Sequence, residues 1–306
     1  MAHAEYVQRF KNWLSRAGLD EKPHQLAGIQ WIFERELAPK RGFPGGFLCD
    51  EMGLGKTILM LGAIVCNYKP RTLIVMPNSL MNQWYEVVGK FLGHNIALIY
   101  HGDVARDYTV DEISKYPIVI TTYGMIAKRK AANYRSKLWD IDWDRVIYDE
   151  AHHLRNKGTR LFEGALIIQQ KSKINWMVTG TPINNDRKDF YNLCVVQGLS
   201  KSFTMSAKEI ADTVRDCVMK RTKKQVGIKM PELNEHVIEV EFESKKEEAF
   251  AKNIHNLMSF ATVTEANVDQ IISEMGSKME YRFPIMMLMR QCCVYPKLAV
   301  RYFRKK

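Results

Sequence analysis

The stretch DEMGLGKT, from Asp50 to Thr57, is the most specific local signal in this sequence. It follows a short apolar run at 46–48 and precedes the apolar stretch ILMLGAIV at 58–65. This order predicts a strand, a turn with two glycines and a buried helix. Glycines let backbone N–H groups converge on phosphate oxygens, and a helix N-terminus attracts anions. The stretch therefore predicts a phosphate-binding loop; a glycine-rich turn that only caps a buried helix is the alternative.

Two side chains in this loop have defined roles in phosphate binding. Lys56 is expected to contact the β- and γ-phosphates of a nucleotide, and the Thr57 hydroxyl to ligate Mg²⁺. The general pattern GxxxxGK[ST] has glycine at its first position, where this chain has Asp50. The match to the general pattern is therefore imperfect at one residue.

A pair of acidic residues supplies the second element of such a site. The apolar run 146–148 leads directly into Asp149 and Glu150, within the sequence DEAH. Burying an unpaired charge is costly, so two carboxylates at the end of a buried strand indicate function. We expect Asp149 to hold Mg²⁺ through water and Glu150 to orient or deprotonate an attacking water.

Short apolar runs separated by helix-length segments indicate an α/β fold. The runs lie at 46–48, 72–76, 96–100, 118–121, 146–148 and 176–179. Continuous apolar strands are typical of a parallel sheet covered on both faces, and ligands bind at the carboxyl ends of such strands. Helical periodicity is expected before residue 37 and again after residue 200. The alternating sequence HVIEVEF at 236–242 predicts a strand that packs against the sheet.

Composition narrows the class of protein. The 306 residues are 46% apolar, which excludes a disordered or fibrous chain. A formal net charge of +11 favours a polyanionic partner, and an ordinary basic surface is the alternative. Six cysteines without zinc-finger spacing fit a reducing, intracellular setting. The longest apolar run, at 58–66, is too short to span a membrane.

Three motifs in this order resemble a known family. DEMGLGKT, DEAH and the tripeptide at 180–182 (Gly-Thr-Pro) are similar to the first motor lobe of superfamily-two, DEAH-box helicases, and more narrowly to the Swi/Snf branch of double-stranded DNA translocases. In that branch Asp or Glu replaces the first glycine of the loop, which accounts for Asp50. The resemblance implies a RecA-like P-loop NTPase lobe with a mostly parallel sheet, followed by a helical protrusion.

The resemblance assigns roles residue by residue. It implies a nucleotide site formed by Gln25, Asp50, Met52, Gly53, Leu54, Gly55, Lys56 and Thr57, with Lys56, Asp149 and Glu150 catalytic and with Thr57 and Asp149 on Mg²⁺. It implies DNA contacts by Pro77, Ser79, Gln83, Trp84, Thr121, Thr122 and Tyr123. It implies coupling of the two sites by Thr179, Gly180 and Thr181. Taken alone, the Thr and Ser residues would be interpreted as helix caps.

The domain and function predictions follow. Residues 1–199 are expected to form the ATP-binding lobe with its N-terminal helices, and 200–306 a mainly helical protrusion leading toward a second lobe. The implied activity is ATP hydrolysis coupled to movement on double-stranded DNA, with ATP and Mg²⁺ as cofactors and a nucleoprotein as a further partner. The expected location is intracellular, in the nucleus or at another site of DNA metabolism. The second lobe supplies arginines for hydrolysis, so this chain alone is expected to bind ATP weakly and to turn it over little.

Two other functions stay open. One is an RNA helicase of the DEAH type, and the other is a nucleic-acid-binding scaffold in which nucleotide only sets the conformation. The basic stretches at 128–137 and 220–224 are either DNA contacts or solvated surface, and 220–224 is alternatively placed at a lobe junction.

Overall fold

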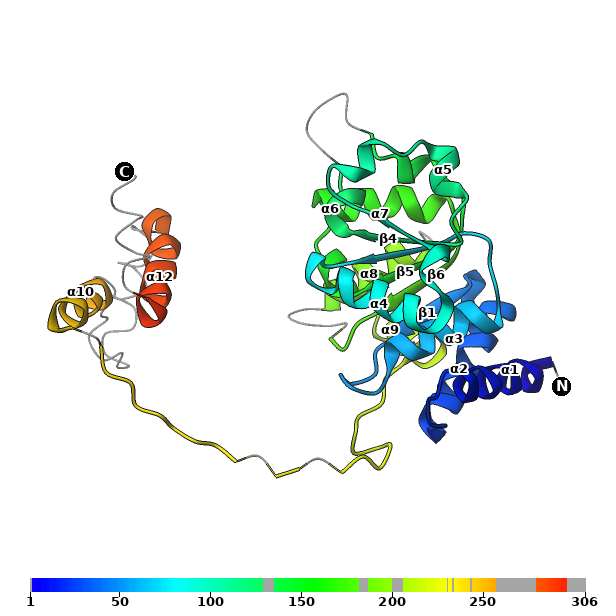
Figure 1. The fold of residues 1–306 in the computed structure, drawn as a ribbon, viewed down its shortest axis with the longest axis horizontal. Helices are drawn as coiled ribbons and strands as arrows, with labels where there is room; N and C mark the ends of the chain where they lie inside the picture. Colours follow the sequence, from blue (N-terminus) through cyan, green and yellow to red (C-terminus); the bar gives the residue numbers. More distant parts are fainter. Residues whose placement is uncertain are drawn as a thin grey trace. The chain divides into compact units, whose positions relative to one another are not determined.

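A computed structural model describes residues 2–128, 135–181, 187–199, 206–229, 231–232, 234–242, 244–256 and 279–295. The chain divides into two compact units, Met1–Pro231 and Glu232–Lys306. The first unit is a seven-stranded sheet covered by helices, and the second contains a pair of helices (Figure 1). In the described part of the chain, no helix is long and apolar enough to span a membrane.

The strands of the first unit lie where the apolar runs predict them. They are β1 (Gly45–Leu48), β2 (Thr72–Met76), β3 (Ala97–Tyr100), β4 (Ile118–Thr122), β5 (Trp143–Asp149), β6 (Ser172–Val178) and β7 (Val218–Met219). All recorded pairings are parallel, and the order is β3-β4-β2-β5-β6-β1-β7. The predicted α/β fold with a parallel sheet is confirmed. The short β7 pairs with β1 and was not predicted, because two residues carry no strand pattern.

Helices precede and connect the strands. They are α1 (Ala2–Arg16), α2 (Pro23–Leu37), α3 (Lys56–Cys66), α4 (Met81–Leu92), α5 (Val110–Ser114), α6 (Tyr123–Ile126), α7 (Arg160–Gln170), α8 (Arg187–Gln197) and α9 (Ala207–Cys217). Local sequence explains several of their starts. Pro23 opens α2, and the side chains of Thr159 and Ser206 accept hydrogen bonds from backbone N–H groups in the first turns of α7 and α9.

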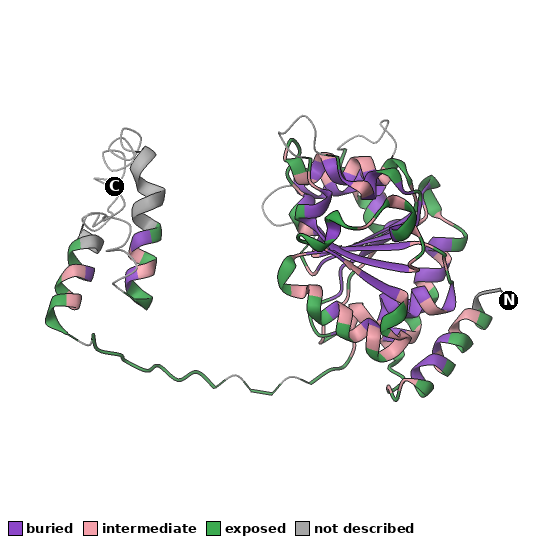
Figure 2. Ribbon diagram, turned by 45° about the horizontal axis from the view of Figure 1, so that its top comes forward, coloured by how far each residue is buried: buried purple, intermediate pink, exposed green. Residues whose placement is uncertain are grey.

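The apolar core lies on both faces of the sheet. Along β2, Leu73 and Val75 belong to one buried cluster, and Ile74 and Met76 belong to the other. Helices α1–α4 contribute to the second cluster, and α5–α8 to the first. Figure 2 shows the strands as buried through the centre of the unit, with exposed residues on the outer faces of the helices. Burial on both faces explains why these strands are continuously apolar rather than alternating.

A buried ion pair ties the helical layer to the sheet. The Glu36 carboxylate in α2 accepts hydrogen bonds from Arg145 Nε (2.8 Å) and Nη2 (2.7 Å) in β5. It also accepts from Trp176 Nε1 at 2.8 Å and from Asn67 Nδ2 at 2.6 Å. The Glu36 and Arg145 side chains are both 0% exposed. These bonds fix α2, the end of α3 and the two central strands to one another.

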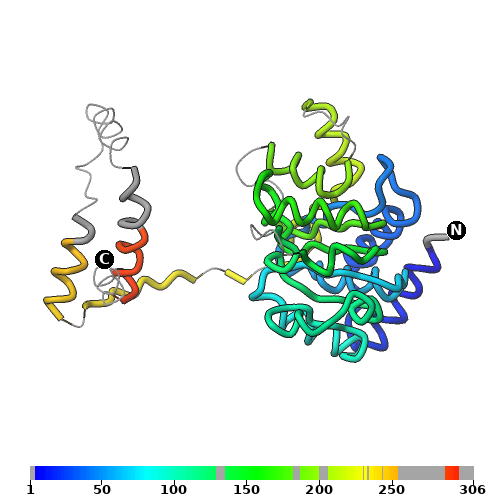
Figure 3. The backbone as a smooth tube through the Cα atoms, turned by 90° about the horizontal axis from the view of Figure 1, so that it is seen from above, coloured from blue at the N-terminus to red at the C-terminus, as the bar shows by residue number. Residues whose placement is uncertain are grey.

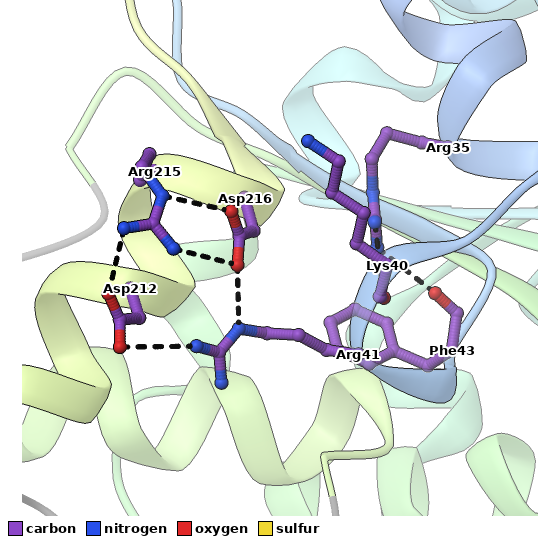
Figure 4. A network of polar contacts seen from close by, with 7 residues as sticks. All are labelled: Arg35, Lys40, Arg41, Phe43, Asp212, Arg215 and Asp216. Carbon is purple, nitrogen blue, oxygen red and sulfur yellow. Dashed lines mark hydrogen bonds and ion pairs between the residues drawn. The ribbon is translucent and has the colours of Figure 1, made fainter.

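Exposed charges attach α9 to the loop before β1. In Figure 4 the Arg41 guanidinium reaches toward two acids of α9, with Nε 3.2 Å from Asp216 and Nη2 3.9 Å from Asp212. Arg35 secures the same loop, because it donates to the carbonyl oxygens of Lys40, Phe43 and Gly45. The path from the N-terminus to α9 can be followed in Figure 3. Helix α9 and β7, although they follow residue 200, thus belong to the same compact unit as the sheet.

The second unit differs from the sequence expectation at one segment. Its helices are α10 (Lys245–Asn256) and α12 (Met279–Val294), which pack through Ala251, Leu288 and Cys292. The prediction of a strand at 236–242 is wrong: these residues pair with no strand among those described, and Val237 is 92% exposed. An alternating pattern specifies a strand only where a sheet edge accepts its backbone bonds. The remainder of the predicted helices, 257–278, lies outside the described residues.

Candidate nucleotide site

The phosphate-binding loop lies at the carboxyl end of β1 and leads into α3. Gly53 and Gly55 have positive φ angles of 89° and 84°, which residues with a side chain rarely adopt. A Cβ atom on Gly55 would lie 2.3 Å from Gln25 Nε2, so a side chain there would have to displace this amide. No side chain caps α3, whose N-cap is Gly55. Its first backbone N–H groups are therefore available to a phosphate.

The two predicted motifs open on one cavity. Strand β6 separates β1 from β5, so the loop after β1 and the acids after β5 lie at the same edge of the sheet. A cavity of about 350 Å³ is lined by Met52, Gly53, Gly55, Lys56, Thr57, Leu80, Gln83, Trp84, Asp149 and Glu150. Lys56 Nζ donates to the Asp50 carbonyl oxygen at 2.8 Å, which holds its charge within the loop.

Asp149 is held by three neighbours. Trp84 Nε1 donates to its Oδ2 at 2.7 Å, and the backbone N–H of Glu150 donates to its Oδ1 at 3.0 Å. The Tyr123 hydroxyl donates to the Asp149 carbonyl oxygen at 2.7 Å. Burial raises the pKa of Asp149, and the bond from Trp84 opposes this shift. The carboxylate is thus fixed in direction while one edge faces the cavity.

Glu150 begins a chain of polar contacts that leaves the cavity. Its backbone is left-handed, with φ 51° and ψ 48°, a conformation uncommon outside glycine and often found at functional sites. His152 Nδ1 lies 3.2 Å from Glu150 Oε2 and 3.1 Å from Thr179 Oγ1. Thr179 Oγ1 in turn accepts from the backbone N–H of Thr181 at 3.2 Å. The acid after β5 is therefore connected to the segment after β6.

Three residues assigned to the nucleotide do not line the cavity. Gln25 is 5% exposed, with Nε2 3.5 Å from the Leu54 carbonyl oxygen. Leu54 is 1% exposed. Asp50 is 0% exposed, and its carboxylate binds the Arg221 side chain. These side chains are buried within or against the loop, away from the cavity. Direct contact between them and a nucleotide stays a prediction.

The residues predicted to contact DNA divide into three groups. Gln83 and Trp84 lie in the wall of the nucleotide cavity, and Trp84 is 2% exposed. Ser79 is exposed in a 3-10 turn (Asn78–Leu80) that follows β2 and the partly buried Pro77.

Thr121, Thr122 and Tyr123 are 0–4% exposed, so these side chains offer little surface to DNA, and contacts between them and DNA stay a prediction. The two threonines are buried because β4 is an interior strand, and the Thr121 hydroxyl donates to the Tyr100 carbonyl oxygen at 2.7 Å. Thr122 precedes α6 but makes no side-chain cap.

A second cavity lies at the carboxyl ends of β3 and β4. Its volume is about 460 Å³, and its lining includes the basic side chains of His101, Arg106, Arg135 and Lys137. Thr122 Oγ1 lies 3.2 Å from His101 Nδ1 in the same wall. Of the basic stretch 128–137, residues 129–134 lie outside the described residues, as does Pro182 of the tripeptide at 180–182.

Comparison with known sequences finds similarity to one family of proteins. The profile of the SNF2-related domain matches residues 24–298. A probable global transactivator of Orgyia pseudotsugata multicapsid polyhedrosis virus is 30% identical over 294 residues, which cover 90% of this chain and 56% of the viral protein. The DNA repair and recombination protein RAD54B of Homo sapiens is 33% identical over 186 residues, 56% of this chain and 20% of that protein.

Structural comparison agrees on the fold. The SWI2/SNF2 ATPase core of Sulfolobus solfataricus in complex with dsDNA superposes with a TM-score of 0.57 at 23% identity, covering 91% of this chain and 59% of that one. The RecA-like α/β fold expected from the sequence is thereby confirmed. This chain spans about half the length of the viral relative and less of RAD54B.

Proposed function

The chain belongs to the SNF2-related domain family, and from this we propose that it is the ATP-binding lobe of an ATP-dependent translocase acting on double-stranded DNA. The observation that carries the proposal is the cavity on which the phosphate-binding loop and the Asp149–Glu150 pair both open. A fold alone hosts many functions, so the argument depends on this geometry.

The loop would hold the triphosphate. The uncapped N-terminus of α3 offers backbone N–H groups and a favourable dipole, and Lys56 adds a cation among them. To reach the β- and γ-phosphates, Lys56 Nζ exchanges its bond with the Asp50 carbonyl oxygen for a stronger bond to a charged oxygen.

The donor set in the cavity fits magnesium. Thr57 and Asp149 both line it, and a hydroxyl with a carboxylate is the oxygen-rich pair that Mg²⁺ takes together with phosphates. When bound, the ion would neutralise charge on the transferring phosphate. No group of three or more His, Cys, Asp or Glu residues that could hold a metal occurs among the described residues.

Glu150 would act on the attacking water. Its carboxylate lies at the mouth of the cavity, and His152 fixes one of its oxygens. A carboxylate in this position orients the water and accepts its proton as the bond to the γ-phosphate forms. The contacts from His152 to Thr179 and on to Thr181 give a route by which the segment after β6 senses the state of Glu150.

DNA would lie along the edge of the sheet beyond β2, β3 and β4. Exposed Ser79 and the basic cavity with Arg106, Arg135 and Lys137 support this, because hydroxyl and basic groups bind phosphates without reading bases. The net charge of +11 is consistent with such a polyanion.

Hydrolysis would require a second lobe of the full protein, which supplies arginines to the transition state, an effect of about 10³–10⁵ in rate. We propose that residues 1–199 form the ATP-binding lobe and 200–306 a mainly helical protrusion, whose first elements, α9 and β7, lie in the same compact unit as the sheet. The expected setting is DNA metabolism in the nucleus, on a nucleoprotein substrate.

We expect duplex DNA, and not single-stranded RNA, to stimulate ATP turnover by a chain that carries both lobes. The measurement is steady-state phosphate release with saturating ATP and Mg²⁺, with each nucleic acid titrated at constant salt. Stimulation by single-stranded RNA alone would favour the RNA-helicase alternative. Nucleotide binding without turnover under any of these conditions would favour the scaffold.

A further inference from the structure

The segment after β7 runs beside the phosphate-binding loop. The backbone N–H of Cys49 donates to the Met219 carbonyl oxygen at 2.7 Å, and that of Glu51 donates to the Arg221 carbonyl oxygen at 2.9 Å. The backbone N–H of Lys223 donates to Glu51 Oε2 at 2.7 Å. Residues 219–223 therefore extend the pairing of β7 with β1 into the first residues of the loop.

Arg221 makes the main side-chain contacts of this segment. Its Nε and its backbone N–H each lie 3.0 Å from Asp50 Oδ1, and its Nη2 donates to Asp50 Oδ2. Its Nη1 donates to the His24 carbonyl oxygen in the first turn of α2. A Cβ on Gly28 would lie 3.0 Å from Nη2, so this glycine leaves room for the guanidinium. The pair is bidentate, and the Asp50 side chain is fully buried.

These contacts join the two elements that frame the loop. Asp50 opens the loop, and its carbonyl oxygen accepts from Lys56 Nζ. In α2, His24 Nε2 lies 3.2 Å from the Leu54 carbonyl oxygen on the other side of the loop. One guanidinium thus fixes the backbone that anchors Lys56 and the helix end that supports the turn of glycines.

We propose that Arg221 is a positioning residue for the phosphate-binding loop, so that the affinity for ATP depends on it although it does not line the nucleotide cavity. The inference rests on the proposed function. Without Arg221, the buried Asp50 carboxylate loses its counter-charge and draws water or rearranges, which shifts the backbone at the start of the loop and with it the groups that would receive the phosphates. The aspartate in place of the first glycine of the loop is then explained as the partner of this arginine.

The test is an equilibrium titration of the 306-residue chain with ATP and Mg²⁺, at a temperature where circular dichroism shows each variant folded. Arg221→Gln should weaken binding about tenfold or more, because the loop would have to be re-ordered when ATP binds, and tenfold corresponds to about 1.4 kcal/mol. Arg221→Lys keeps the charge but loses the bidentate geometry, so its affinity for ATP should lie between those of wild type and Arg221→Gln. Lys224→Gln, an exposed residue of the same basic block, should bind within about twofold of wild type.

A double variant separates positioning from stability. Asp50→Asn removes the uncompensated charge, so Asp50→Asn/Arg221→Gln should bind ATP no more weakly than Arg221→Gln. If Arg221→Gln does not fold, the ATP affinities of Arg221→Lys and of the double variant show whether binding depends on Arg221. Wild-type affinity in these variants, with only a lowered Tm, overturns the inference and leaves the proposed function intact. Failure of the wild-type chain to bind ATP overturns both.

Discussion

Replacing Glu150 with Gln is expected to lower ATP turnover by the two-lobed protein about 10²- to 10⁴-fold, the contribution of a general base, while ATP binding stays within about twofold. The amide keeps the size of the side chain and its place at the mouth of the cavity. It cannot accept the proton of the attacking water. Loss of turnover with retained binding would show that chemistry, and not assembly of the site, depends on this carboxylate.

The matched control is Glu86→Gln, the same chemical change on an exposed position of α4, which should leave turnover unchanged. Phosphate release under single-turnover conditions separates hydrolysis from product release. Turnover by Glu150→Gln equal to that of wild type would remove Glu150 from the reaction and favour the scaffold alternative.

Replacing Arg145 with Met is expected to lower the free energy of unfolding of the first unit by about 3–5 kcal/mol, the usual cost of breaking a buried pair from one side. The Glu36 carboxylate would remain 0% exposed with donors only from Trp176 and Asn67. Because a domain of this size is stable by about 5–15 kcal/mol, the loss is a large fraction of the total. Urea unfolding followed by tryptophan fluorescence measures it.

Two further variants test whether the loss of stability in Arg145→Met comes from the buried ion pair. Arg215→Met breaks ion pairs to Asp212 and Asp216, but the arginine is 69% exposed, so the cost should be at most about 1 kcal/mol. Glu36→Gln in the Arg145→Met background removes the buried charge that has lost its partner, and it should restore part of the lost free energy of unfolding. Equal costs for Arg145→Met and Arg215→Met would contradict a role for the buried pair in holding α2 on the sheet.

The sequence predicted the sheet because its strands are buried on both faces. Continuous apolar runs mark such strands directly, and the predicted run 72–76 coincides with β2. Strand β5 proved longer than its apolar run, since Asp144 and Arg145 are charged yet buried in ion pairs. A residue pattern cannot show in advance that a charge has a buried partner elsewhere in the chain.

The candidate nucleotide site was predictable where a short motif contains its residues, and it was not predictable where residues far apart in the sequence meet. Lys56, Thr57, Asp149 and Glu150 converge as their positions at strand ends imply. The contact of Trp84 with Asp149 and that of Arg221 with Asp50 span 65 and 171 residues, and no local signal encodes them. A basic block such as 220–224 has the composition of a solvated surface, although one member is committed to a buried aspartate.

Equilibrium titration of the 306-residue chain with ATP and Mg²⁺ shows whether the loop after β1 and the acids after β5 form a nucleotide site. We predict saturable binding that Lys56→Ala weakens about tenfold or more, through loss of a charged contact to phosphate. Lys157→Ala, at an exposed lysine, should bind as wild type does. If the wild-type chain did not bind ATP, or if Lys56→Ala bound it equally well, these two elements would not form a nucleotide site.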